Sequence, residues 1–114
     1  MKKSPDSPTA TIRAVSATQK DEGRFIVSGT LGFDTAPDLM KQAQRLFTPF
    51  NSVVIDFSEV DNCNSAGLAV VLEIAKQMRQ QNISVCFQSL PEQIHTFARA
   101  YSIEEEFSQS GLLC

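Results

Sequence analysis

The sequence is poor in the residues that staple a small domain or bind a metal. It has no tryptophan, one histidine and three cysteines among 114 residues. The cysteines, Cys63, Cys86 and Cys114, are odd in number and include no Cys-x-x-Cys pair, so we expect no disulfide framework and a reducing compartment. Because His95 has no cysteine or histidine cluster around it, we also expect no zinc site and no other metal site.

Positive charge and long apolar segments are scarce as well. The formal net charge is −3 and the sequence pI is about 5.0, which gives no broad attraction for nucleic acid or anionic lipid. The apolar run over residues 68–72 ends at Glu73 and is too short to span a bilayer. Residues 1–3 are basic, but prolines rather than an apolar segment follow them, so we expect no signal peptide. These absences predict a cytoplasmic protein that binds no nucleic acid and does not insert into a membrane.

The apolar residues that are present predict a single α/β domain. Residues 1–9 are expected to form a flexible lead and residues 10–114 the domain. Alternating or continuous apolar runs predict strands over residues 11–18, 24–31, 52–57 and 83–88, and three-to-four spacing predicts helices over about 35–47, 64–81 and 91–101. The order ββαβαβα, with a final short element, predicts a mixed sheet of four to five strands with helices mainly on one side.

Several local features are also predicted. Gly29 inside a strand pattern indicates a bulge or a close backbone approach, and Asn82 is suited to end the second long helix. The polar residues 58–64 are expected to form a loop before that helix. In the last segment we expect Phe107 to enter the core and the tail over residues 108–114 to pack through its leucines.

The segment around Ser65 is the leading candidate for a functional site. A buried strand ends there, Asn64 is suited to cap the next helix, and Ser65 places a hydroxyl on the first turn. A serine at this position often only helps to start a helix. No base can be assigned to it from the sequence, and no Gly-x-Ser-x-Gly elbow is present, so we expect no catalytic residue and no enzyme.

The neighbouring residues leave alternatives open. Cys63 is either a reactive thiol activated by the helix N-terminus or, as we prefer, a small half-buried residue. Asp56, Glu59 and Asp61 are either an acid–base or metal group or, more commonly for such spacing, a solvated rim.

Three segments together resemble the STAS domain of bacterial anti-sigma-factor antagonists: residues 25–31, 54–60 and 64–72. In that family the loop before the second long helix usually reads Asp-Ser/Thr-x-Gly, and its hydroxyl is phosphorylated in the sigma-regulating members. Ser65 and Gly67 match that pattern, whereas Asn64 replaces the usual Asp. The resemblance therefore implies a STAS fold and a possible phosphorylation site at Ser65.

Within the family, residues 65–72 and 87–103 are more similar to the small STAS subunit of the Mla phospholipid-transport system. That resemblance implies a non-catalytic, cofactor-free subunit that binds the cytoplasmic ATPase of an ABC transporter and reaches the inner membrane only through this partner. The implied contact residues are Asn62, Cys63, Asn64, Ser65, Ala66 and Ala69. The alternative is an anti-sigma-factor antagonist whose partner is a kinase-type anti-sigma factor that phosphorylates Ser65.

Overall fold

The structure is a computed structural model that describes residues 9–19, 22–103, 105 and 112–114. Its elements follow the predicted order ββαβαβα. They are β1 (Ala10–Gln19), β2 (Glu22–Leu31), α1 (Ala36–Phe47), β3 (Ser52–Cys63), α2 (Ser65–Gln80), β4 (Ser84–Gln88) and α3 (Glu92–Ala100).

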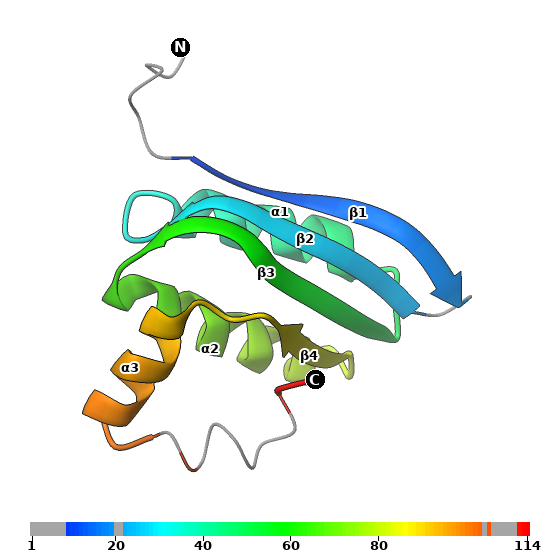
Figure 1. The fold of residues 1–114 in the computed structure, drawn as a ribbon. Coiled ribbons are helices and arrows are strands. Elements are labelled where there is room, and N and C mark those ends of the chain that lie inside the picture. Colours follow the sequence, from blue (N-terminus) through cyan, green and yellow to red (C-terminus); the bar gives the residue numbers. More distant parts are fainter. Residues whose placement is uncertain (1–8, 20–21, 104, 106–111) are drawn as a thin grey trace.

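The strands form one mixed sheet in the order β1-β2-β3-β4. The β1–β2 pair is an antiparallel hairpin, while β2–β3 and β3–β4 are parallel. Two crossovers, through α1 and α2, each step one strand in the same direction, so right-handed connections place both helices on the same side. Figure 1 shows this arrangement, with the helices behind and below the sheet and none in front of it. The predicted fold class is confirmed.

The core fills the space between the sheet and the helices. Its largest fully buried side chains include Phe57, Phe87 and Leu31 from the sheet and Phe47, Ile74 and Ile94 from the helices. The Phe57 and Phe87 rings meet edge-on with centroids 5.7 Å apart, a favoured aromatic geometry. Val54 is only 7% exposed, and its neighbours Val53 and Ile55 are also buried. Because successive side chains of a strand point to opposite faces, both faces of β3 are covered here. This is the burial expected of a central strand with an apolar pattern on both faces.

The prediction of a loop over residues 58–64 is wrong, because β3 continues to Cys63. Glu59 pairs with Ser28 and Asn62 with Thr30, across two register shifts. The backbone of this segment is thus held by β2 while most of its polar side chains face solvent. An apolar pattern cannot detect a strand end that is fixed by backbone pairing alone.

The two local backbone predictions are confirmed. Gly29 has φ 98° and lies at a β2–β3 register shift, and a Cβ there would collide with the carbonyl oxygen of Thr9. Asn82 has φ 60° and ends α2. The Ile83 N–H donates to the Met78 carbonyl (2.8 Å) and the Asn82 N–H to the Arg79 carbonyl (3.0 Å), which is the Schellman pattern.

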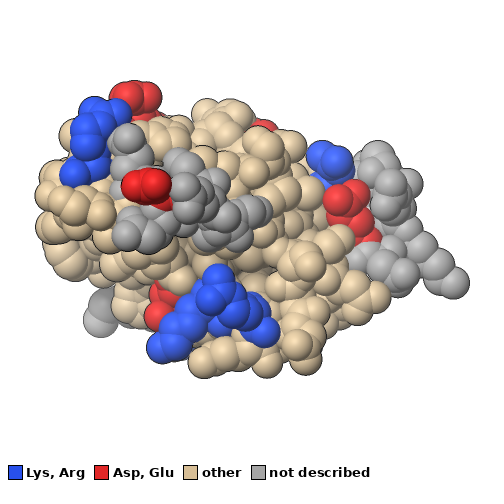
Figure 2. Space-filling model, turned by 90° about the horizontal axis from the view of Figure 1, so that it is seen from below, with Lys and Arg blue, Asp and Glu red and all other residues tan. Residues whose placement is uncertain are grey.

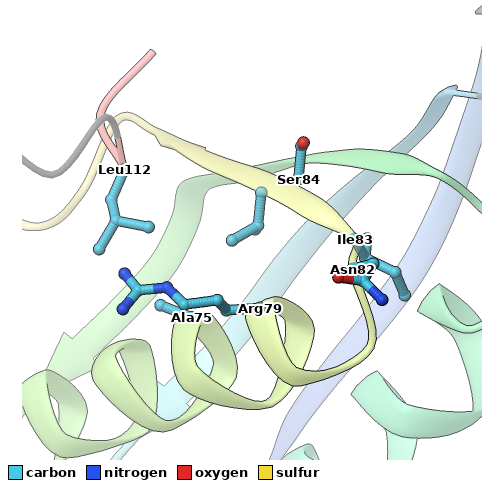
Figure 3. Close-up of a pocket in the computed structure, with 7 residues that line it drawn as sticks. Ala75, Arg79, Asn82, Ile83, Ser84 and Leu112 are labelled. Atoms are coloured by element: carbon cyan, nitrogen blue, oxygen red, sulfur yellow. The ribbon is translucent and has the colours of Figure 1, made fainter.

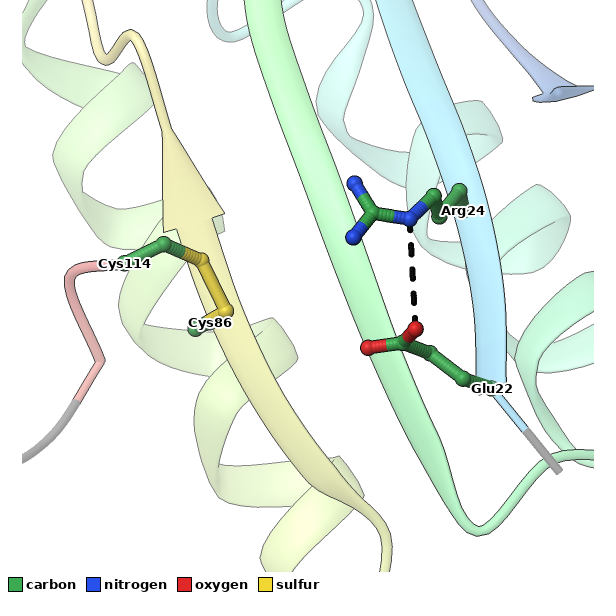
Figure 4. The surroundings of a disulfide bond; sticks show 4 residues. All are labelled: Glu22, Arg24, Cys86 and Cys114. Atoms are coloured by element: carbon green, nitrogen blue, oxygen red, sulfur yellow. Dashed lines mark ion pairs between the residues drawn. A yellow bond between two sulfur atoms is a disulfide. The ribbon is translucent and has the colours of Figure 1, made fainter. Parts of the chain in front are cut away.

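The expectation of unpaired cysteines is wrong for Cys86 and Cys114, which form a disulfide. Residues 112–114 lie beside β4, where Phe87 and Leu113 form a parallel bridge, and this places the two cysteine Cα atoms 5.3 Å apart. Figure 4 shows the bond at the edge of the sheet. The cysteine count therefore no longer supports a reducing compartment. Leu112 is buried, as predicted for the tail, whereas Phe107 lies outside the described residues.

Within the described part of the chain, no helix has both the length and the apolar character needed to cross a bilayer.

The Gly29 geometry gives a stability prediction. Gly29→Ala is expected to lower the free energy of unfolding by about 1–3 kcal/mol, because alanine must adopt a positive φ and displace the Thr9 backbone. The matched control is Ser28→Ala in the same strand, expected to change stability by no more than about 0.5 kcal/mol. Urea denaturation measures both, and equal stabilities for the two variants would contradict the prediction.

Candidate protein-docking site

The start of α2 is fixed by the hydrogen bonds of Asn64. Its backbone has φ −113° and ψ −172°, and its side-chain Oδ1 accepts from the Ala66 N–H at 2.9 Å. The Asn64 carbonyl accepts from the Gly67 N–H (2.9 Å), and the Asn64 N–H donates to the Leu31 carbonyl at the end of β2 (3.1 Å). The predicted cap is confirmed, and it joins α2 directly to the sheet.

Two glycines allow this junction to close. A Cβ on Gly32 would lie 2.7 Å from the Asn64 side-chain nitrogen, and one on Gly67 would lie 2.5 Å from the Cys63 sulfur. The Gly67 Cβ would also lie 3.2 Å from side-chain carbons of Ile94 and Leu31. Glycine at these positions therefore lets the first turn of α2 approach β2, β3 and α3.

Thr35 supports the loop that precedes α1. It is buried, and its hydroxyl donates to the Thr30 carbonyl at 2.7 Å while accepting from the Gly32 N–H at 3.1 Å. Thr35 occupies the position before the helix and Pro37 lies in its first turn, although the Thr35 side chain makes no capping bond to the helix. The loop is thereby closed on itself, with Phe33 at its exposed tip.

Ser65 is one of the residues that line a shallow apolar groove between α2 and the end of α3. We call it the α3 groove; its volume is about 300 Å³. Its lining comprises Phe33, Ser65, Ala66, Leu68, Ala69, Leu72, Tyr101 and Ile103. Ser65 is the first residue of α2 and is half-buried.

A second groove, the α1 groove, lies on the other side of Ala69 and has a volume of about 380 Å³. It is lined by Phe33, Ala36, Pro37, Met40, Ala66, Ala69, Val70 and Glu73. Phe33, Ala66 and Ala69 belong to both grooves, so the two form one continuous surface, which we call the docking face. Phe33 is 71% exposed, Tyr101 61% and Leu72 36%.

The docking face carries little charge. Glu73 is the one charged residue among those that line the two grooves. Figure 2 shows the side of the molecule that bears α2 and α3: most of its surface is uncharged, and lysine and arginine gather in separate groups near its edges. An exposed surface of this kind suits contact with another apolar surface.

The six residues expected to make contact do not all lie on this face. Ser65, Ala66 and Ala69 line the grooves. Asn62 and Asn64 are exposed close by in sequence, at the end of β3 and at the helix cap, while Cys63 is only 8% exposed and belongs to the core. The sequence interpretation missed Phe33, Leu72 and Tyr101 as surface residues; an isolated aromatic in a Gly-Phe-Asp loop was the available signal for Phe33.

Cys63 is a small buried residue rather than a reactive thiol. Burial raises the pKa of the Cys63 thiol, so the group stays protonated at neutral pH. Its sulfur lies 3.4 Å from the Asn64 carbonyl oxygen, to which the S–H donates. A neutral, buried thiol is a poor nucleophile, so Cys63 acts here as a small core residue.

Two of the three nearby acids have structural partners. Asp56 Oδ1 accepts from the Ser58 N–H at 2.8 Å, and Glu59 pairs with Arg13 at 2.7 Å. Among the described residues, no three side chains from His, Cys, Asp and Glu group closely enough to hold a metal ion. The site thus offers a hydroxyl, a capped helix start and an apolar surface, which are the elements of a protein contact.

This architecture, with a hydroxyl at the start of the helix that follows the central strand, is that of a STAS domain. The family model described as "Mlab, STAS domain" matches residues 15–113. The chain belongs to this family. A comparison with curated proteins gave no significant match.

Solved structures with the same fold include regulators and transporter domains. A crystal structure of an anti-sigma factor antagonist from Mycobacterium paratuberculosis is 18% identical, with a TM-score of 0.67 over 90% of this chain and 85% of its own. The unphosphorylated anti-sigma factor antagonist SpoIIAA is 9% identical, with a TM-score of 0.59 over 83% and 84%. The inward-facing murine Solute Carrier 26 family member A9 anion transporter is 8% identical, with a TM-score of 0.68 over 94% of this chain but 20% of its own. The chain spans about a fifth of that transporter and of two other structures that it matches. At these identities the likeness concerns the fold.

The Asn64 cap predicts a measurable loss of stability. Asn64→Ala removes the acceptor for the Ala66 N–H and is expected to lower the free energy of unfolding by about 1 kcal/mol. Asn64→Asp keeps the acceptor oxygen and is the matched control, expected to retain most of the stability. Thermal and urea denaturation distinguish the two; an alanine variant as stable as the aspartate variant would show that the cap contributes nothing.

The Gly67 contact predicts a coupled pair. Gly67→Ala alone is expected to lower stability by about 1–2 kcal/mol, because the new methyl group meets the Cys63 sulfur. In a Cys63→Ala background the same change is expected to cost much less, since the sulfur is gone and alanine favours the helix. A double-mutant cycle measures the coupling. An unchanged cost in that background would mean that Ile94 and Leu31, rather than Cys63, restrict the site.

Proposed function

We propose that this chain is a non-catalytic STAS subunit that binds the cytoplasmic ATPase of a phospholipid-transport ABC complex of the Mla type. The observation that carries the proposal is the match of residues 15–113 to the family described as "Mlab, STAS domain". In this proposal the protein is cytoplasmic, supports the assembly and activity of the transporter, and reaches the inner membrane through the ATPase.

The docking face is the proposed contact surface. It has an apolar lining and two exposed aromatic residues, Phe33 and Tyr101. Apolar and aromatic side chains are enriched at the centres of protein interfaces. Ala69 between the grooves is small and exposed, so a partner side chain can approach the helix closely there. Asn62 and Asn64 are proposed to lie at the polar rim, and Ser65 within the contact.

The alternative function is that of an anti-sigma factor antagonist regulated by phosphorylation of Ser65. A phosphate at the first position of α2 would be favoured by the positive end of the helix, but it would also place a dianion against the α3 groove. Such a group would repel an apolar partner surface. Release of a partner on phosphorylation is the behaviour expected of an anti-sigma factor antagonist. The identity of the captured partner distinguishes this alternative from the preferred function.

The proposal predicts that a charge on the docking face weakens binding of the ATPase. Ala69→Asp and Ser65→Asp are each expected to weaken binding of the ATPase at least about 30-fold, because a carboxylate must be desolvated in an apolar contact. Gln80→Asp is the matched control: it adds the same charge to an exposed position of α2 outside both grooves and is expected to leave binding unchanged. Affinity capture from native cells in mild detergent, followed by titration with the purified ATPase, measures these effects.

Capture of a kinase-type anti-sigma factor, together with mass-spectrometric detection of phosphate on Ser65, would instead support the alternative. Recovery of the folded protein with neither ATPase nor permease would contradict the preferred function. Equal weakening by Gln80→Asp would contradict the location of the contact, since that variant leaves the grooves intact.

A further inference from the structure

The backbone of residues 112–114 is hydrogen-bonded to the sheet at a single residue of β4, Phe87. The Phe87 N–H donates to the Leu112 carbonyl at 2.6 Å, and the Cys114 N–H donates to the Phe87 carbonyl at 3.0 Å. Leu113 bridges Phe87 in parallel register. The Cys86–Cys114 disulfide is the covalent attachment beside these two hydrogen bonds.

One side chain of the segment, Leu112, is buried at the same place. It is 9% exposed and lines a groove of about 450 Å³ between α2 and β4. The remaining lining comprises Ala75, Arg79, Asn82, Ile83, Ser84 and Val85. Figure 3 shows Leu112 and Arg79 at the same end of this groove, with Asn82 and Ile83 at the other end. Leu112 therefore covers one end of this groove.

Within the described part of the chain, the non-covalent attachment of this segment is limited to a few contacts. A hydrogen bond contributes little net free energy, and ordering a residue costs a comparable amount. Among the described residues, two hydrogen bonds, the buried Leu112 and the partly buried Leu113 must therefore offset the loss of freedom of three residues. The disulfide closes a loop between residues separated by 28 positions, so it supplies the constraint that these contacts lack.

The disulfide is also accessible to a reductant. Cys114 is exposed and Cys86 half-buried on an edge strand of the sheet, as Figure 4 shows, whereas Cys63 is buried in the core. Attack by a thiolate requires access to a sulfur atom of the bond. Cys86 and Cys114 are therefore accessible for thiol–disulfide exchange, whereas Cys63 is not.

We propose that Cys86 and Cys114 form a redox-controlled latch that holds residues 112–114 on the edge of β4. A dithiol reductant opens it: the S–S bond breaks, the reductant supplies two electrons and two protons, and its own two sulfur atoms become a disulfide. The products are the free thiols of Cys86 and Cys114. Release of the segment exposes the backbone of Phe87 for pairing with another strand and uncovers the groove occupied by Leu112. Closure is the reverse reaction with an oxidised dithiol.

Hydrogen exchange in the full chain tests the latch. Dithiothreitol is the reductant, and complete reduction is verified from the mass increase of about two hydrogens. On reduction, the amides of Phe87 and Cys114 are expected to lose protection at least about tenfold, whereas those of Ala66 and Gly67 at the start of α2 keep theirs. The double variant Cys86→Ser/Cys114→Ser is expected to resemble the reduced protein under both conditions, and Cys63→Ser to respond like the unmodified chain.

Three results would overturn the latch. Unchanged protection of Phe87 and Cys114 after complete reduction would show that the non-covalent contacts suffice. Loss of protection throughout α2 and β3, in the reduced protein and in the double serine variant, would show that the disulfide staples the whole fold. Resistance of the bond to dithiothreitol without denaturant would show that it is a permanent crosslink. None of these results bears on ATPase binding, so they are distinct from failure of the proposed function.

Discussion

The hydrogen bonds of Asn64 are the interaction on which the candidate site depends. One residue caps α2 through its side chain and ties that helix to the end of β2 through its backbone N–H. Gly32 and Gly67 make this possible, because a side chain at either position would occupy the space that Asn64 or the neighbouring core requires. The position of Ser65 at the start of α2 follows from this junction.

The docking face is built from elements that are distant in the sequence. Phe33 comes from the loop before α1, Ala66 and Ala69 from α2, and Tyr101 from the end of α3. The loop is closed by the Thr35 hydroxyl, and α3 ends in the Schellman pattern at Ser102, where Ile103 N–H donates to the Ala98 carbonyl. Rigid turns on both sides therefore present apolar side chains without requiring a partner to order them first, which favours binding.

Local patterns in the sequence are sufficient to predict the element order, the Asn64 cap, the bulge at Gly29 and the end of α2 at Asn82. Each depends on residues adjacent in the chain, where the chemistry of a cap or a positive φ is decisive. The extension of β3 to Cys63 escaped prediction because β2 holds its backbone, and the backbone pairing leaves no apolar signal. The exposure of Tyr101 and the Cys86–Cys114 bond depend on tertiary placement, which no local spacing encodes.

The sheet topology also has a consequence for the rate at which the domain forms. β1 and β2 are adjacent in the chain and pair as a hairpin, whereas β2 and β3 can align only after the chain has passed through α1. Closing that longer loop costs entropy before the parallel contacts repay it. The hairpin should therefore form early, with β2–β3 alignment limiting the folding rate. Substitutions between α1 and β3 would then slow folding, while those in α3 would mainly speed unfolding.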